Sequence, residues 1–358
     1  MKAFEKNIRK VEPYVPGEQP QRKVIKLNTN ENPYPPAPGV TKALEEMDTD
    51  RFRLYPDPTA APLVNALADF YHVNPDQVFV GVGSDDVLSM CFLTFFNSEK
   101  PIFFPDITYS FYSVWADLYR IPYECQKLDE DFKLVKEDYY KENGGVIFPN
   151  PNAPTGIYED LSVVEDIIAH NQDVIVIVDE AYIDFAGCSA LELIDKYDNL
   201  IVVQTFSKAR SMAGMRIGYA ISNPTLIKYL NDAKYSFNSY TMNQTSIVCG
   251  VEAVKDREYF ENGVRKIVET REWAKEELTK LGFTYLDSGS NFIFAKHPKY
   301  DAKELFEALK AHDIYVRFWG SERIEQYMRI TIGTREEMEQ LFAFLKEYMW
   351  RGSEQLQK

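Results

Sequence analysis

The sequence predicts an α/β protein with a mostly parallel sheet in a larger domain and a smaller α+β domain at its C-terminal end. In the centre of the chain, short runs of β-branched and aromatic residues alternate with helix-length segments. Such continuous apolar runs are typical of strands buried on both faces of a parallel sheet. After about residue 255, strand-like and helix-like segments form a shorter unit. The 358 residues are enough for two domains, or for one large core with an appendage.

The elements follow in order along the chain. Residues 1–40 are dense in Pro, Asn and Gly and predict an extended arm with turns, which we expect to pack on the smaller domain or on a second copy of the chain. The larger domain is expected over residues 41–255 and the smaller over 256–358. Helix-like stretches lie at 40–47, 62–71, 85–96 and 245–281, and a final one at 335–349. The strands expected in the larger domain are QVFVGVG (77–83), PIFFP (101–105), GVIFPNP (145–151), DVIVIVDEAY (173–182), LIVVQTFSK (200–208) and MRIGYAIS (215–222).

Composition narrows the class of protein. The chain is 45% hydrophobic, which is typical of a globular protein. Its formal charge of −15 argues against nucleic acid or an anionic membrane surface as a partner. No uncharged run is apolar and long enough to cross a bilayer, and no apolar leader is present. The four cysteines form no C-x-x-C pair, and the four histidines have no metal-ligand spacing. We therefore expect a cytoplasmic protein that binds no metal.

Polar residues at strand ends are the candidates for chemistry, because ligands of open parallel sheets bind beyond the carboxyl ends of the strands. The run that ends at Gly83 opens into a helix through Ser84 and Asp85. Free N–H groups and the helix dipole at such a start can hold an anion. The same pattern is more often a capped tight turn. It matches neither a Walker loop nor G-x-G-x-x-G.

An acid and a lysine follow two successive runs. Asp179 and Glu180 end one apolar run, and Lys208 ends the next. Singly, such an acid is often a helix cap and such a lysine is usually solvated. Together with an anion site they match the needs of pyridoxal phosphate: a lysine amine, a carboxylate at the pyridine nitrogen and a phosphate cradle. Arg216 is near enough in sequence to add a phosphate donor. Tyr109 is placed to cover the ring, although core packing is commoner for a tyrosine.

These residues lie within motifs that resemble, in order and spacing, those of the fold-type I pyridoxal-phosphate aminotransferases. Among these, the similarity is to the histidinol-phosphate aminotransferase family, and it covers essentially the whole chain. The motifs are PYVPG at Tyr14, LNTNENP ending at Pro33, RLYPDP (53–58), GVGSDDVL (81–88), PDITYSFY (105–112), PNAPTG (151–156), VDEAYIDF (178–185), TFSKARSMAGMRIGY (205–219) and MRITIGTREE (328–337). The resemblance implies a seven-stranded type of sheet, pyridoxal phosphate as the cofactor and a homodimer with shared active sites.

The resemblance also implies roles for individual residues. Lys208 would form the Schiff base with the cofactor, and Asp179 would contact the pyridine nitrogen. Tyr182 would hydrogen-bond the phenolic oxygen, and Tyr109 would stack on the ring.

The remaining implied cofactor contacts concern the phosphate. It would lie on the backbone amides of Ser84 and Asp85, with Ser207 and Arg216 beside it. Tyr55 would reach it from the partner subunit.

One position departs from the family pattern. The family usually has Asn-Pro-Thr-Gly, whose asparagine bonds the same phenolic oxygen as Tyr182, and this chain has Ala153 in that position. Asn152 stands directly before it. We expect the loop to shift so that Asn152 takes over the bond.

The implied reaction is ping-pong amino transfer from L-histidinol phosphate to 2-oxoglutarate, which yields imidazole acetol phosphate and glutamate. Arg329 would clamp the carboxylate of glutamate or 2-oxoglutarate, and the arm residues Tyr14 and Asn30 would contribute to substrate binding. Aromatic amino-acid aminotransferases and threonine-phosphate decarboxylase share the motifs and stay as alternatives. A non-catalytic binding protein would be expected to lose Lys208 or Asp179, and a nucleotide-dependent enzyme would carry a phosphate-loop signature.

Overall fold

The computed structural model describes residues 2–355, with side chains as far as residue 350. Its largest sheet has seven strands in the order β2-β8-β7-β6-β5-β3-β4. β8 runs antiparallel to both of its neighbours, and every other pairing in this sheet is parallel. In chain order the strands are β2 (Val78–Gly81), β3 (Ile102–Pro105), β4 (Tyr123–Gln126), β5 (Val146–Pro149), β6 (Val176–Asp179), β7 (Leu200–Thr205) and β8 (Gly218–Ser222).

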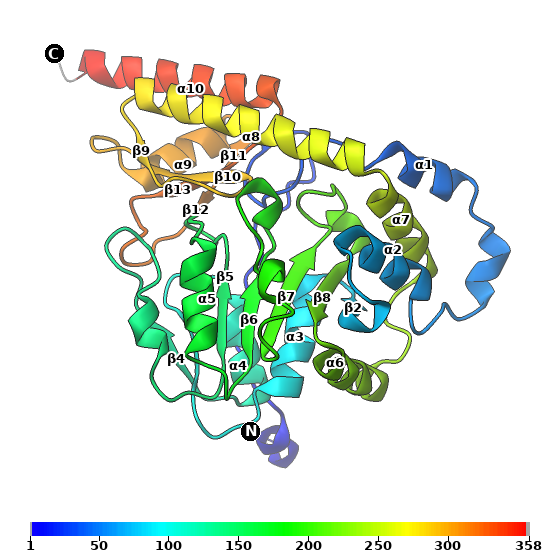
Figure 1. Cartoon of the computed structure of the whole chain (residues 1–358). Coiled ribbons are helices and arrows are strands. Elements are labelled where there is room, and N and C mark those ends of the chain that lie inside the picture. Colours follow the sequence, from blue (N-terminus) through cyan, green and yellow to red (C-terminus); the bar gives the residue numbers. More distant parts are fainter. Residues whose placement is uncertain (1, 356–358) are drawn as a thin grey trace.

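Helices cover both faces of this sheet (Figure 1). Successive strand residues point to opposite faces, so Val176 and Val178 of β6 join one core cluster and Ile177 joins another. Burial on both faces explains why the strands read as continuous apolar runs. The first face packs on α2 (Ala61–Tyr71), α5 (Leu161–Ala169) and α7 (Gln244–Lys255), and the second on α3 (Ser84–Phe95), α4 (Phe111–Tyr119) and α6 (Pro224–Phe237).

The C-terminal region has its own antiparallel sheet, in the order β12-β13-β10-β9. A separate apolar cluster joins this sheet to three helices, and α8 and α10 lie side by side along it (Figure 1). The elements are α8 (Arg257–Lys280), β9 (Thr284–Tyr285), β10 (Phe292–Lys296), α9 (Ala302–Ala311), β12 (Arg317–Phe318), β13 (Met328–Thr331) and α10 (Arg335–Gln355).

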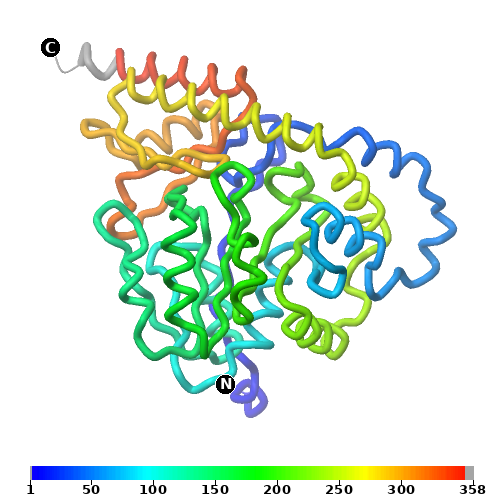
Figure 2. The backbone as a smooth tube through the Cα atoms, in the orientation of Figure 1, coloured from blue at the N-terminus to red at the C-terminus, as the bar shows by residue number. Residues whose placement is uncertain are grey.

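The N-terminal arm crosses to the C-terminal region. β1 (Ile25–Lys26) pairs in parallel with β11 (Ile314–Tyr315), and Figure 2 shows the blue start of the chain running up to meet this region. α1 (Pro38–Glu45) begins within the expected arm, because a proline fits the first turn of a helix, where no N–H is needed. Short 3₁₀ segments are Ala3–Asn7, Thr49–Arg53, Pro75–Gln77, Lys136–Tyr139, Ile183–Phe185, Ala190–Leu193 and Ala213–Met215.

The predicted fold class is confirmed, and one predicted element is corrected. The stretch 245–281 forms two helices, because α7 ends at Lys255 and Asp256 starts α8 by accepting the backbone N–H of Tyr259 at 3.0 Å. Side-chain caps of this kind favour a helix start over its continuation. Within residues 2–355, no helix combines the length and apolarity that crossing a bilayer requires.

The strand directions bring residues from three connections to one edge of the sheet. β6 and β7 are parallel and end at this edge, where Asp179 and Lys208 lie. β8 runs in the opposite direction, so Arg216, just before its first residue, returns to the same edge.

Candidate active site

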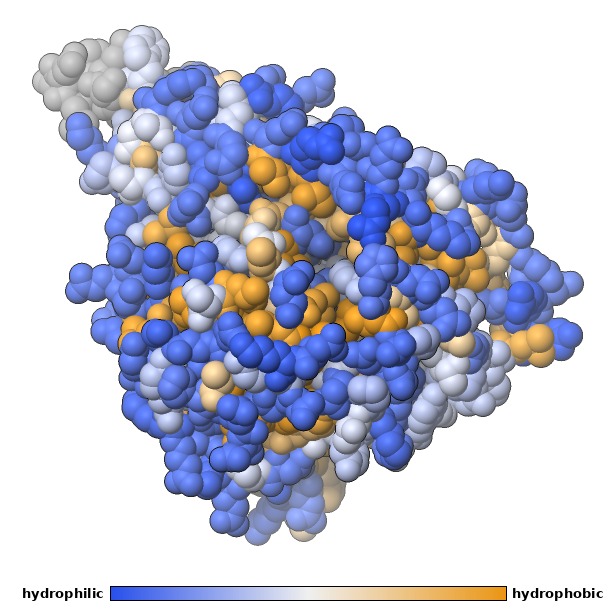
Figure 3. Space-filling view, viewed as in Figure 1, coloured by the Kyte–Doolittle hydropathy of each residue, from blue (hydrophilic) through white to orange (hydrophobic). Residues whose placement is uncertain are grey.

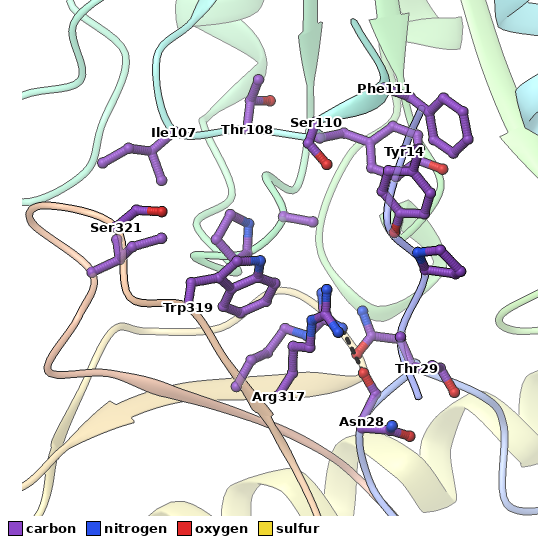
Figure 4. Close-up of a pocket in the computed structure, with 18 of the residues that line it drawn as sticks. Tyr14, Asn28, Thr29, Ile107, Thr108, Ser110, Phe111, Arg317, Trp319 and Ser321 are labelled. Carbon is purple, nitrogen blue, oxygen red and sulfur yellow. Dashed lines mark hydrogen bonds between the residues drawn. The ribbon is translucent and has the colours of Figure 1, made fainter. Parts of the chain in front are cut away.

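Two adjoining cavities lie at this edge. The inner cavity, of about 250 Å³, reaches Ser84, Asp179 and Ser207. The outer cavity, of about 1010 Å³, extends to the arm and to the loops after β3 and β12 (Figure 4). Residues that line both cavities include Asp85, Tyr109, Tyr182, Lys208 and Arg216. The structure therefore brings most of the predicted cofactor residues to one place.

Asp179 is buried at the end of β6 and is held from two sides. Tyr112 Oη donates to its Oδ2 at 2.7 Å, and the backbone N–H of Ala181 donates to its Oδ1 at 3.3 Å. Burial raises the pKa of Asp179 to about 6, although the Tyr112 bond acts in the opposite direction. Glu180 turns to the other face of the strand and accepts from Gln204 Nε2 at 2.8 Å. Only Asp179 of this acidic pair lines the inner cavity.

Lys208 extends from the end of β7 between the two cavities. Its Nζ lies 3.4 Å from the carbonyl oxygen of Thr29 and 5.6 Å from the centre of the Tyr182 ring. Among the described residues, no carboxylate lies within ion-pair distance of this amine. The amine is thus held in the cavity without being tied to an acid.

An anion cradle lies at the start of α3. The first N–H groups of a helix have no intrahelical partner, and here they belong to Ser84 and Asp85. The guanidinium of Arg216 approaches from the opposite side, with Nη1 3.5 Å from Ser207 Oγ and Nη2 3.2 Å from Asp85 Oδ2. Gly83 permits this approach, because its φ is +88° and a Cβ there would lie 2.5 Å from Arg216 Nη2.

Two tyrosines line the cavities from different parts of the chain. Tyr109 donates its hydroxyl proton to Asp85 Oδ1 at 2.7 Å, and burial raises its pKa. Tyr14 comes from the arm, stacks on Phe111 with 4.2 Å between ring centres, and lines the outer cavity (Figure 4).

Asn152 is not placed where the sequence led us to expect it. Its Oδ1 accepts from Thr108 at 3.1 Å, and its Nδ2 donates to the backbone oxygen of Ile107 at 2.9 Å and to Thr155 Oγ1 at 3.0 Å. The side chain thus ties its own loop to the loop after β3, and it lines neither cavity. Ala153 lines both.

Asn30 lines the outer cavity, but its side-chain amide is already bonded inside the protein. Nδ2 donates to Tyr182 Oη at 2.8 Å, and Oδ1 accepts from Thr331 Oγ1 at 3.0 Å. One N–H and one lone pair of the amide are therefore engaged within the protein, and the expected substrate contact stays a prediction.

Arg329 lines the outer cavity together with two residues that the sequence analysis missed, Arg317 and Trp319. Arg329 Nη2 donates to the backbone oxygen of Asn28 at 2.9 Å, while its buried Nε has no hydrogen-bond partner. Both guanidinium groups lie against the Trp319 ring, at 5.1 and 5.3 Å from its centre. Burial, assisted by the charge of Arg317, lowers the pKa of Arg329 to about 10.

Tyr55 lies outside both cavities of its own chain. It is 81% exposed and stacks on Tyr240 with 4.6 Å between ring centres.

Comparison with known proteins supplies the family. The family model for class I and II aminotransferases matches residues 22–345. Histidinol-phosphate aminotransferase of Lactococcus lactis subsp. cremoris (strain MG1363) is 51% identical over 97% of this chain and 98% of its own. That of Clostridium botulinum (strain Kyoto / Type A2) is 49% identical over 95% of this chain and 96% of its own.

A solved structure agrees with these relatives. Histidinol-phosphate aminotransferase from Sinorhizobium meliloti, in complex with pyridoxal-5'-phosphate, superposes with a TM-score of 0.81 at 25% identity and covers 91% of each chain. By sequence and by fold, this chain belongs to the class I and II aminotransferases, a family of pyridoxal-phosphate enzymes, and within it to the histidinol-phosphate aminotransferases.

Proposed function

We propose that the protein transfers the amino group of L-histidinol phosphate to 2-oxoglutarate in a ping-pong reaction, giving imidazole acetol phosphate and glutamate. The observation that best supports this proposal is the pair of adjoining cavities, inner and outer. The inner one combines an acid, a lysine amine and an anion cradle, and the outer one is lined by Arg317 and Arg329 among other residues.

The residues of the inner cavity fit pyridoxal phosphate. The cradle of Ser84, Asp85, Ser207 and Arg216 offers N–H, hydroxyl and guanidinium donors for a phosphate. Asp179 is fixed at another part of the same cavity, where a carboxylate keeps a pyridine nitrogen protonated. The family's cofactor supplies an electron sink for carbanionic charge when it is bound.

The chain's own residues then hold the cofactor and move protons. Lys208 Nζ would be the amine that holds the cofactor, and the same amine would serve as the general base that moves a proton at the substrate carbon. Asp179 would keep its charge beside a protonated pyridine nitrogen, because a bound cation would offset the burial that raises its pKa in the free protein. Tyr182 Oη, on the wall of the cavity, would donate a hydrogen bond to the phenolic oxygen.

The two arginines suit a site that must accept different anions in the two half-reactions. Within the described residues, neither Arg317 nor Arg329 forms an ion pair with a carboxylate. An unpaired guanidinium offers parallel N–H donors to a phosphate or a carboxylate. We propose that they bind the phosphate of histidinol phosphate and the carboxylate of glutamate in turn, with Tyr14 of the arm closing the site.

We also propose a homodimer in which Tyr55 serves the site of the partner subunit. Exposed apolar and aromatic side chains lie on α1 and the following segment, which carries Tyr55, and on α6 and the residues up to Tyr240, on which Tyr55 stacks. Figure 3 shows apolar atoms at the projecting end of the molecule that carries α1 and the following segment. The exposed set is Leu44, Phe52, Leu54, Tyr55, Tyr229, Tyr235, Phe237 and Tyr240. A patch of this kind is typical of a protein–protein interface.

Absorbance spectroscopy of the purified holoenzyme tests the substrate. We expect a visible cofactor band that is lost on adding L-histidinol phosphate without a keto acid, and that phenylalanine changes far less. Lys208→Ala should remove turnover and leave the circular dichroism spectrum unchanged. A band that responds mainly to phenylalanine would overturn the substrate, and release of CO₂ instead of a keto product would overturn transamination.

A further inference from the structure

Asn30, in the N-terminal arm, forms hydrogen bonds through its backbone N–H, its backbone oxygen and both polar atoms of its side chain. It is 1% exposed, and its φ of +56° is a conformation that asparagine tolerates better than most residues. Its backbone N–H donates to Thr331 Oγ1 at 3.0 Å, and its backbone oxygen accepts from Asn291 Nδ2 at 3.0 Å. Its side chain bonds Thr331 and Tyr182.

These bonds fix the direction of each proton. Thr331 Oγ1 accepts from the backbone of Asn30, so its own proton is free to go to Asn30 Oδ1. With Oδ1 occupied in this way, the amide Nδ2 must face Tyr182 Oη, at 2.8 Å. The tyrosine oxygen therefore accepts from Asn30, and its own proton points elsewhere.

The remaining direction for that proton is the cavity. Tyr182 lines both cavities, and its ring is held edge-on against Phe292 with 5.2 Å between ring centres. Ala153, which also lines both cavities, offers no side-chain donor. The side-chain amide of Asn152 donates to Ile107 and Thr155 instead.

We propose that Asn30 is a positioning residue that holds Tyr182 as a hydrogen-bond donor toward the phenolic oxygen of the cofactor. This rests on the proposed function, which places the cofactor in the inner cavity. A bond accepted by the hydroxyl oxygen also polarises its O–H, so the tyrosine becomes a stronger donor. Asn30 thus compensates, through Tyr182, for the donor that Ala153 lacks.

The arrangement has a measurable consequence. The phenolic oxygen carries more negative charge when the nitrogen that joins Lys208 to the cofactor loses its proton. A donor to that oxygen stabilises the deprotonated form and lowers the pKa of the nitrogen. A net hydrogen-bond contribution of about 0.5–1.5 kcal/mol corresponds to roughly 0.4–1 pH unit.

Other charged and titratable groups face the same space and contribute to this pKa in every variant. They come from the arm, α3, the loop after β3, β6, the connection from β7 to β8, and the strands of the C-terminal sheet. They include Tyr14, Glu31, Asp85, Tyr109, Asp179, Arg216, Arg317 and Arg329, and the outer cavity is also lined by Asp106, Lys127, Glu322 and Arg323. Uncharged substitutions leave all of them in place.

The experiment is a pH titration of the visible absorbance of the holoenzyme. Asn30→Gly removes the amide and tolerates the positive φ, and Thr331→Val removes the bond that orients the amide. We expect both variants to raise the midpoint of the titration, in the same direction as Tyr182→Phe. Thr108→Val is the matched control: it breaks a bond to Asn152 nearby and should leave the midpoint unchanged.

The outcomes separate the two proposals. A midpoint that rises in Tyr182→Phe but not in Asn30→Gly or Thr331→Val would overturn the role of Asn30 and leave the proposed function standing. An equal rise in Thr108→Val would also overturn it. A wild-type protein with no visible band after addition of pyridoxal phosphate would overturn the proposed function, and this inference with it.

Discussion

At the scale of single residues, burial determines the chemistry of Asp179. The carboxyl group would ionise near pH 3.8 in an exposed position, and burial raises its pKa to about 6. Tyr112, whose hydroxyl bonds Asp179, stands three residues after Tyr109 in the first turn of α4. That spacing puts the two tyrosines on one side of the chain, and it is the signal by which sequence analysis could have found Tyr112.

The raised pKa of Asp179 predicts a pH-dependent effect on stability in the cofactor-free protein. Below about pH 4 the group is protonated in both the folded and the unfolded state. As the pH rises to about 6 the unfolded chain loses this proton first, so stability falls, and above pH 6 the full penalty is present. Asp179→Asn removes the penalty and should raise the melting temperature, with a gain that grows from pH 4 to 6 and is then constant.

Thermal unfolding followed by circular dichroism measures this difference. Glu180 and Asp184 also have pKa values raised by burial, to about 7 and 6, but they are the same in both proteins and do not enter the difference. At about 1.4 kcal/mol per pH unit, the gain is at most about 3 kcal/mol. A variant less stable than the wild type at pH 8 would contradict this account of Asp179.

At the scale of elements, the start of α3 depends on a backbone that only glycine permits. Gly83 has a φ of +88°, and a Cβ there would lie 2.5 Å from Arg216 Nη2. Gly83→Ala should therefore displace the guanidinium from the cradle and weaken cofactor binding at least tenfold, which a fluorescence titration with pyridoxal phosphate measures. Gly214→Ala is the control, because a Cβ at Gly214 meets no atom within 4 Å. Equal affinities in the two variants would count against the cradle.

Some secondary-structure elements could be predicted from the sequence, and others could not. The strands were predictable because burial on both faces requires runs such as 174–178. The boundary between α7 and α8 at Asp256 could not be predicted, because both flanking segments have helical periodicity. A single helix cap decides whether they form one helix or two. Arg317 was missed because it lies within an apolar strand-like run, and whether such a charge faces a cavity depends on the packing of distant strands.

At the scale of the whole molecule, the positions of Asn30 and Asn152 could not be inferred from motifs. The sequence placed Asn30 in an extended arm with turns and Asn152 directly after a predicted strand. The hydrogen bonds of Asn30 reach Thr331, some three hundred residues away in sequence. Such contacts are set by the assembled fold and leave no local pattern in the chain.

The proposed dimer gives the prediction for the whole molecule. Leu54 is 52% exposed, beside Tyr55 in the exposed apolar set. Leu54→Glu places a charge in the proposed interface and should shift the sedimentation coefficient to that of a monomer while lowering activity at least tenfold, because Tyr55 no longer reaches the second site. Trp350→Glu, at a side chain of α10 that is 62% exposed, should change neither. A wild-type protein that sediments as a monomer would refute the dimer.

Because β8 runs antiparallel to β7, the segment that joins Lys208 to Arg216 must have a fixed length. Only residues 209–215 separate Lys208 from Arg216, and β8 must then pair with β7 in the register that sets Gly218 opposite Thr205. Adding or deleting one residue there would either withdraw the arginine from the phosphate or slip the strand, which would turn its side chains to the wrong face. This segment therefore accepts changes of side chain far more readily than insertions or deletions.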